Sequence, residues 1–394
     1  MIRPPAETQA SLGARVRAWR VLQACETAAD VAELTEAQLA VGMHPQVLAR
    51  EFWSGGKVSA SASLMTAWHA VRDWRHALNE AESLTSFQLV HAHSFVAAMA
   101  SVRGGSPSVY DFDQTLEETM QSGAVAGPWM LRSFRVAEQF ALSRASAVVT
   151  HTRSMAKVAH ERGAAAGSVF VVPEPMETRR IIADRQWAAL HGIDLGYHAV
   201  LFALPSCDGI EPALRAFASV LIEMEQAVLV FEFGNADRES LLRLARELEI
   251  ADNIRCIAAD EQDQALACAD VVLTEPKGDD RRVNDRMLRA MAAGKAVVAA
   301  DVEENRECSP DGRGVIWYRA GDIQDLAQRA SFVARNADFS RALGESGQIH
   351  VRNTCARDVV GRMYDEVYRY AQSRRSDNLP KIGVPKLYTA NVQI

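Results

Sequence analysis

Residues 284–301 read NDRMLRAMAAGKAVVAAD and carry two periodicities in succession. Met287, Leu288 and Met291 recur at helical spacing, and Gly294 follows them as a residue that commonly ends a helix. The apolar run AVVAA comes next and is typical of a strand that is buried on both faces. A helix that turns through a glycine into such a strand predicts one unit of a parallel α/β sheet.

The same alternation continues on both sides of this stretch. Short apolar runs are separated by longer amphipathic stretches, over about 20–172 and more clearly over 199–335. Pro173 and Pro175 interrupt the pattern between the two halves. Strands that alternate with helices form parallel sheets with helices on both faces. We therefore predict two Rossmann-like α/β domains that face each other across a cleft.

The expected domains are an N-terminal one over 1–180, a C-terminal one over 190–355, and a closing helix with a loosely ordered tail over 356–394. A chain of 394 residues, 48% of them hydrophobic, is long enough for two packed cores. The sequence contains no GxGxxG fingerprint, which disfavours a dinucleotide-dependent oxidoreductase.

Composition argues against several other classes of protein. The formal net charge of −7 disfavours a nucleic-acid-binding protein. The six cysteines are scattered without a CxxC pair, so we expect small core residues in a reducing cytosol. No apolar stretch is long enough to cross a membrane, and the N-terminus lacks the apolar core of a signal peptide. We therefore expect a cytoplasmic protein.

The order of several motifs resembles the retaining glycosyltransferases of family 4, which have the GT-B fold of two Rossmann-like domains. LVHAHS at 89–94, AVVTHTRSMAKVAHERG at 147–163 and ADVVLTEP at 269–276 are similar to strand-and-turn segments of that family. LRAMAAGKAVVAADVEENRE at 288–307 is the most specific match. The resemblance covers most of residues 20–370.

The resemblance implies transfer of a hexose from a nucleotide sugar, with retention, to a glycan or glycolipid acceptor in polysaccharide assembly. The N-terminal domain would bind the acceptor and the C-terminal domain the nucleotide sugar. The nucleotide sugar is a substrate, and the family implies no other cofactor. Other glycosyltransferases are further expected partners.

Several positions that carry function in the family hold different residues here. Asp113 stands near the family's histidine, and Glu174-Pro175 replaces its Asn-Gly. The other replacements are Cys25 to Ala28 for a glycine pair, Leu204 and Asp208 for the phosphate-binding Arg and Lys, and Arg281 and Arg289 for the paired glutamates. Arginine has only donors, so it cannot accept hydrogen bonds from sugar hydroxyls as a glutamate does.

These replacements leave two interpretations open. The protein is either an active hexosyltransferase or a non-catalytic homologue that serves as a scaffold or regulatory subunit. Four arginines crowd the first turns of a predicted helix and the approach to it, where they could bind a phosphate: Arg281, Arg282, Arg286 and Arg289. The alternative is a solvated charged face in which they pair with Asp279, Asp280 and Asp285.

Further candidate ligand-binding residues lie at the ends of predicted strands, where α/β sheets bind ligands. His91 and His93 are spaced by two and point the same way. The sequence shows no carboxylate or third ligand beside them, so we expect cleft lining rather than a metal site. His151 and Glu275 also end strands. Asp113 is either a catalytic base or a loop-capping residue.

The predicted helix at 61–81 mixes Trp68 and Trp74 with basic residues. Such a helix either touches a membrane surface from the cytoplasmic side or packs its tryptophans in the core.

Overall fold

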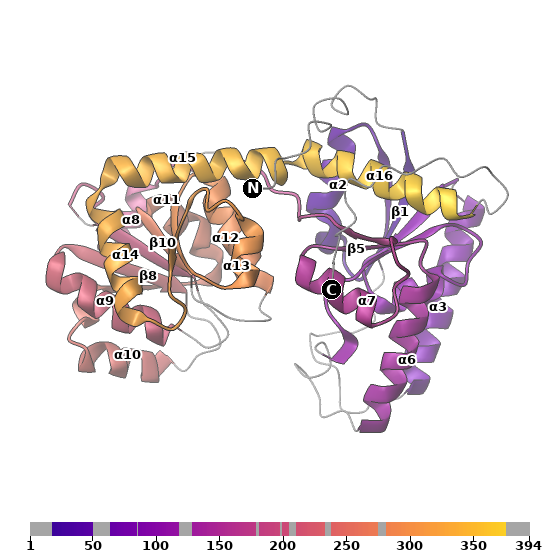
Figure 1. The fold of residues 1–394 in the computed structure, drawn as a ribbon, viewed down its shortest axis with the longest axis horizontal. Coiled ribbons are helices and arrows are strands. Elements are labelled where there is room, and N and C mark those ends of the chain that lie inside the picture. Colours follow the sequence, from indigo (N-terminus) through magenta and orange to yellow (C-terminus); the bar gives the residue numbers. More distant parts are fainter. Residues whose placement is uncertain are drawn as a thin grey trace. The chain divides into compact units, whose positions relative to one another are not determined.

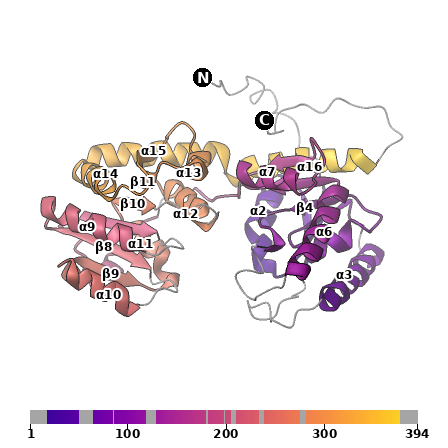
Figure 2. The same cartoon turned by 60° about the horizontal axis from the view of Figure 1, so that its bottom comes forward.

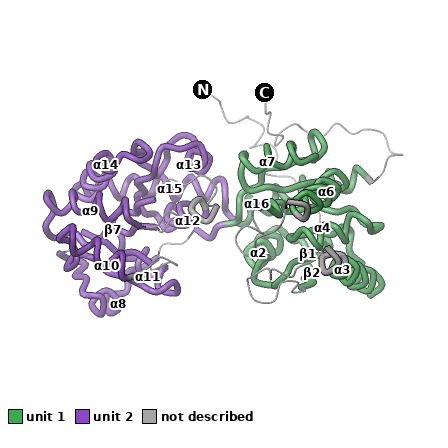
Figure 3. The backbone as a smooth tube through the Cα atoms, turned by 90° about the horizontal axis from the view of Figure 1, so that it is seen from below, with its two compact units in different colours: residues 1–175, 357–394 green, residues 176–356 purple. Residues whose placement is uncertain are grey.

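The computed structural model describes residues 18–49, 64–84, 86–117, 128–178, 181–197, 199–204, 210–232, 238–274 and 281–375. The chain forms two compact units, of which one contains residues 1–175 and 357–394 and the other 176–356 (Figure 3). Each unit holds one parallel six-stranded sheet. The predicted α/β fold class is confirmed, and the predicted cleft between the domains stays a prediction.

The sheet of the first unit has the strand order β2-β1-β3-β4-β5-β6. Its strands are β1 Arg20–Cys25, β2 His44–Ala49, β3 Leu89–Ala92, β4 Ser108–Asp111, β5 Ala147–Thr150 and β6 Val169–Val171. Every residue of β3, β4 and β5 is buried, as expected for central strands covered on both faces. These three strands are parallel neighbours, and their carboxyl ends lie at the same end of the sheet.

Helices cover both faces of this sheet (Figure 1). They are α2 Ala32–Ala40, α3 Leu64–Leu84, α4 Phe95–Ser101, α6 Pro128–Arg144, α7 Arg153–Glu161 and α16 Arg357–Arg375, with the 3-10 turn η1 at Ala28–Val31. The helices α3, α4, α6 and α7 pack on one face, and α2 and α16 pack on the other. The last helix of the chain therefore completes the core of the first unit.

The second unit repeats this architecture with the strand order β12-β11-β10-β7-β8-β9. Its strands are β7 Ala199–Leu204, β8 Ala227–Glu232, β9 Ile254–Ile257, β10 Val271–Thr274, β11 Ala296–Ala300 and β12 Val315–Tyr318. Its helices are α8 Arg185–Leu190, α9 Glu211–Glu223, α10 Arg238–Glu247, α11 Gln262–Cys268, α12 Arg281–Ala292, α13 Glu303–Cys308, α14 Ile323–Arg335 and α15 Ala337–Thr354, with η2 Ala251–Asn253 and η3 Ala259–Glu261. Figure 2 shows these helices in layers about the sheet.

The stretch NDRMLRAMAAGKAVVAAD forms most of the helix α12 and the buried strand β11. Met287 and Met291 are fully buried, and Gly294 takes a φ of +73°, which favours glycine. Lys295 donates its ammonium group to the carbonyl oxygens of Ala267 and Ala269, at 2.7 and 2.9 Å. The helix begins at Arg281, a little earlier than the apolar periodicity indicates.

The helix α3 contains the aromatic and basic residues that suggested membrane contact. Trp74 is only 2% exposed and packs with Val71 and Leu78 in the core of the first unit. The membrane interpretation is therefore wrong for Trp74, while the Trp68 side chain lies outside the described residues. Within the described part of the chain, no helix is long and apolar enough to cross a membrane.

Candidate functional site

Polar side chains gather at the carboxyl ends of β3, β4 and β5 in the first unit. His91 lies in β3 and His93 follows it, while Asp111 is the last residue of β4 and His151 follows β5. The local sequence fixes both turns, because Ser94 and Thr152 cap the helices α4 and α7 with their side chains. The carboxyl edge of a parallel sheet is the usual ligand-binding edge.

Asp111 is the centre of this cluster. One carboxylate oxygen, Oδ2, lies 3.1 Å from His93 Nδ1 and 3.9 Å from His91 Nε2. The other, Oδ1, lies 3.3 Å from His151 Nε2. The Asp111 side chain is 6% exposed, and that of His91 is completely buried. A carboxylate is thus enclosed by three imidazole rings at the sheet edge.

His151 links this buried centre to the solvent. Its Nδ1 donates to the carbonyl oxygen of Val172 at 2.8 Å, which directs Nε2 toward the carboxylates. Nε2 lies 3.1 Å from Asp113 and 3.9 Å from Glu174, whose side chains are both about half exposed. The outer rim of the cluster is therefore acidic and accessible.

The pKa values in the cluster separate charged groups from neutral ones. Burial alone would raise the pKa of Asp111, but His151 and His93 outweigh it and hold this pKa well below its usual range. Burial alone would lower the pKa of His151, but Asp111 and Asp113 hold it well above its usual value. Burial, together with the neighbouring imidazoles, keeps the pKa of His91 well below normal. These opposing shifts favour the charged forms of Asp111 and His151 and the neutral form of His91.

A chain of buried hydrogen bonds supports the two histidines of β3 from behind. The hydroxyl of Tyr368 in α16 lies 3.0 Å from His91 Nδ1 and accepts a hydrogen bond from Gln38 Nε2 at 2.5 Å. The amide of Gln23 donates to Gln38 Oε1 at 2.8 Å, and its Oε1 lies 2.6 Å from His93 Nε2. Both rings are therefore fixed in orientation before any ligand arrives.

The structure brings together four of the residues that the sequence analysis named: His91, His93, Asp113 and His151. It also adds Asp111 and Tyr368, which the sequence analysis missed. The expectation that no carboxylate accompanies the two histidines is wrong, because Asp111 reaches them from the neighbouring strand. The available signal was an aspartate at the end of the apolar run SVYD.

The remaining candidates belong to the second unit. Arg289 forms an i, i+4 ion pair with Asp285 at 3.0 Å, and its side chain is 58% exposed. Arg286 is half-buried on the same helix. Glu275 and the side chain of Arg281 lie outside the described residues. For Arg289, the geometry fits the alternative of a solvated charged face.

Leu204, expected at a phosphate-binding position, ends β7 and is 4% exposed in the core. Its side chain packs among the apolar residues of that core. Asp208, the other residue expected at a phosphate-binding position, lies outside the described residues.

Comparisons with known proteins agree with this architecture. Residues 195–336 match the family model described as glycosyl transferases group 1. A sucrose-phosphate synthase from Thermosynechococcus elongatus superposes with a TM-score of 0.64 at 14% identity, covering 91% of this chain and all of the other. The chain has the GT-B glycosyltransferase fold. No curated protein sequence matches it.

Two further GT-B structures extend this likeness over nearly the whole chain. A glycosyltransferase from Rickettsia africae gives a TM-score of 0.66 at 12% identity, covering 92% of this chain and 99% of the other. The Anabaena protein HepE, solved with UDP and glucose, gives 0.63 at 16% identity, covering 89% and 99%. At these identities the likeness establishes the GT-B fold and not the substrate.

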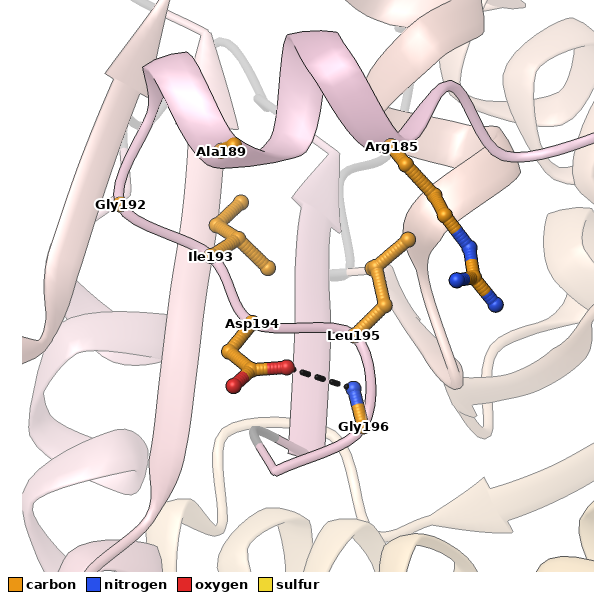
Figure 4. A pocket seen from close by; sticks show the side chains of 7 residues that line it. All are labelled: Arg185, Ala189, Gly192, Ile193, Asp194, Leu195 and Gly196. Carbon is orange, nitrogen blue, oxygen red and sulfur yellow. Dashed lines mark hydrogen bonds between the residues drawn. The ribbon is translucent and has the colours of Figure 1, made fainter.

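A pocket of about 550 Å³ lies in the second unit, between α8 and the start of β7 (Figure 4). Its lining residues are Arg185, Ala189, Gly192, Ile193, Asp194, Leu195 and Gly196. Asp194 accepts a hydrogen bond from the Gly196 amide at 2.9 Å and so stabilises the turn that forms the wall. The pocket precedes β7 and is therefore at the edge opposite to the carboxyl ends of the strands. We assign it no ligand.

Proposed function

We propose that the protein transfers a hexose, with retention, from a nucleotide sugar to a hydroxyl group of a glycan or glycolipid acceptor. The GT-B fold and the match of residues 195–336 to glycosyl transferases group 1 support this proposal. The fold is shared with HepE, whose structure contains UDP and glucose. The observation that carries the proposal is the buried cluster of Asp111 with His93 and His151 at the carboxyl ends of the strands.

Burying such a cluster costs free energy. Transfer of an ion pair out of water costs several kcal/mol per ion, and apolar residues of similar volume are often at least as stable. A cluster with perturbed pKa values at the ligand-binding edge of a sheet therefore indicates a functional site. The acidic rim of this cluster is suited to sugar hydroxyls, which donate hydrogen bonds to carboxylates.

In this proposal Asp113 receives the acceptor. Its carboxylate is half exposed and is held by His151 at 3.1 Å, so one oxygen remains available for an incoming hydroxyl group. The bond between the anomeric carbon and the diphosphate breaks, and a bond between that carbon and the acceptor oxygen forms. The proton of the hydroxyl group passes to Asp113, while the nucleoside diphosphate departs with the bond electrons.

On the donor side, the proposal assigns phosphate binding to Arg281 and Arg286 and sugar binding to Glu275. Arginine forms bidentate hydrogen bonds with phosphate, and the start of a helix favours an anion. Arg286 lies in the second turn of α12 and is only half-buried.

A second candidate function is a non-catalytic role beside other glycosyltransferases. Two observations favour this role. Leu204 is buried in the core, and Arg289 forms an ion pair with Asp285. The resemblance to family 4 glycosyltransferases leads us to expect donor-binding groups at both positions.

The test is an assay of nucleoside diphosphate release from a panel of UDP-, ADP- and GDP-hexoses, with and without simple glycoside acceptors. We expect one donor to be consumed by the purified full chain. Asp113→Asn keeps the size of the side chain and removes the base, so transfer should fall roughly 100-fold or more, as is typical of a lost general base.

The matched control is Asp338→Asn in the second unit, because the Asp338 side chain is 96% exposed and pairs with Arg341 on its own helix. This control should transfer at the wild-type rate. Transfer that survives Asp113→Asn would contradict the assignment of the base. Absence of donor consumption across the panel would favour the non-catalytic alternative.

A further inference from the structure

We infer that His91, His93 and Asp111 bind one divalent transition-metal ion of the Zn²⁺ class. The inference rests on the side-chain geometry of the first unit and does not depend on the proposed glycosyl transfer. It also departs from the expectation, drawn from the sequence, that these histidines only line a cleft.

The three side chains present one ligand atom each to a common point. Their ligand atoms all lie within 4.8 Å of one another. His93 Nδ1 and His91 Nε2 are 3.1 and 3.9 Å from the same oxygen of Asp111. Ligands bound to Zn²⁺ at about 2.0–2.2 Å in a tetrahedron are roughly 3.3 Å apart, so small side-chain rotations suffice.

Two buried atoms of this group lack hydrogen-bond partners among the described residues: His91 Nε2 and Asp111 Oδ1. The contact of Asp111 Oδ1 with His151 at 3.3 Å is close enough for an ion pair but lacks hydrogen-bond geometry. The His91 side chain is completely buried, so water does not reach it from the surface. An unpartnered buried nitrogen is costly, and a metal ion would satisfy it.

The other nitrogen of each imidazole already has a partner that would orient a metal ligand. His91 Nδ1 contacts the Tyr368 hydroxyl at 3.0 Å, and His93 Nε2 contacts Gln23 Oε1 at 2.6 Å. Histidines that bind metals nearly always hold their second nitrogen in this way, because it fixes the tautomer and the ring plane. Two such supports on two adjacent ligands are difficult to explain by packing alone.

A second set of ligands, Asp111, Asp113 and His151, is also close enough to share an ion. His151 Nε2, however, already lies 3.3 Å from Asp111 and 3.1 Å from Asp113. His91 Nε2 is 3.9 Å from Asp111 and has no hydrogen-bond partner among the described residues, and this difference favours the set that contains His91.

The proposed site supplies three protein ligands, and a tetrahedral ion takes a fourth. The His93 side chain is 10% exposed, so water or a substrate hydroxyl group can reach the ion from that side. Three protein ligands with one open position are typical of zinc ions that activate a bound hydroxyl group or water. The ion would also add positive charge beside Asp111, Asp113 and Glu174.

The test titrates the full chain with Co²⁺, whose visible absorption reports tetrahedral nitrogen and oxygen ligands. The protein is purified through a tag without histidine and stripped with a chelator. We expect one Co²⁺ per chain, displaced by Zn²⁺. His93→Gln should weaken Co²⁺ binding about 100-fold or more, and Tyr368→Phe about 10- to 100-fold, the usual effect of losing a supporting hydrogen bond.

The control is His44→Gln, an exposed histidine at the start of β2, which should leave binding unchanged. Near-ultraviolet circular dichroism confirms that each variant is folded. Absence of a saturable Co²⁺ signal in the wild-type chain would overturn the inference, as would full binding by His93→Gln. Loss in His151→Gln with retention in His93→Gln would place the ion in the second set and also overturn it. Transfer is assayed separately, so either proposal can fail alone.

Discussion

A buried carboxylate keeps its charge only where neighbouring groups replace the water it has lost. For Asp111, these neighbouring groups are His151 and His93. Glu117, in the same unit, is a partly buried carboxylate that pairs with Arg135 and Arg162, at 2.5 and 2.6 Å. Burial alone would raise the pKa of Glu117, but its hydrogen bonds to the two arginines outweigh burial and lower it.

This shift predicts a pH-dependent contribution to stability. A carboxylate whose pKa is lowered in the folded state stabilises the fold above its unfolded pKa, and this stabilisation is lost as the pH falls through the folded pKa. Glu117→Gln should therefore unfold at lower urea concentration than wild type at pH 7, and the difference should shrink as the pH drops below about 4. A difference that stays constant with pH would contradict the ionic role of Glu117.

The helix α16 shows how one element sets the geometry of the site. Gly361 lies against α2, and a Cβ atom there would come within 2.6 Å of the Ala37 carbonyl oxygen. The close approach of the two helices seats Tyr364 and Tyr368 over the sheet, where Tyr368 contacts His91. A side chain at position 361 would have to push α16 away from α2.

We therefore predict that Gly361→Ala destabilises the first unit by about 1–3 kcal/mol, the usual cost of overpacking. On an isolated helix, replacing glycine by alanine would stabilise the helix by roughly 0.5–1 kcal/mol. A loss of stability at position 361 therefore reports the clash with α2. Urea unfolding measures it, with Glu366→Ala on the exposed side of α16 as the control. An increase in stability would show that α16 is not held by this contact.

The sequence predicts best the strands that are buried on both faces, because they read as continuous apolar runs. The six strands of the second unit follow apolar runs of the sequence, as AVVAA does for β11. The helix α15 has no clear apolar period in the sequence, because Gly344 and Gly347 interrupt its pattern. They are there for close packing: a Cβ atom at Gly344 would come within 2.1 Å of the Gly294 carbonyl oxygen.

Part of the candidate site was accessible to sequence reasoning. His91, His93, Asp113 and His151 were found because strand ends are local features. The partnership of His91 with Tyr368 was not, because 277 positions separate these residues and only tertiary packing joins them.

At the scale of the whole molecule, the first unit is built from both ends of the chain and the second from its middle. Structures with 12 to 16% identity share this architecture over 89 to 92% of the chain. The core needs only apolar residues of suitable size at buried positions, so the fold tolerates this divergence. A functional site, in contrast, needs particular residue types, and the fold alone does not determine the activity.

Calorimetric titration of the full chain with UDP, ADP and GDP tests the proposed transfer most directly, because every nucleotide-sugar reaction requires the diphosphate to bind. We predict one nucleoside diphosphate bound per chain. Its affinity should fall roughly tenfold or more in Arg286→Ala, the effect of losing a charged hydrogen bond. It should be unchanged in Arg335→Ala, an exposed arginine that pairs with Glu223. Absence of binding by all three nucleotides would contradict the transferase and leave the GT-B fold in a non-catalytic role.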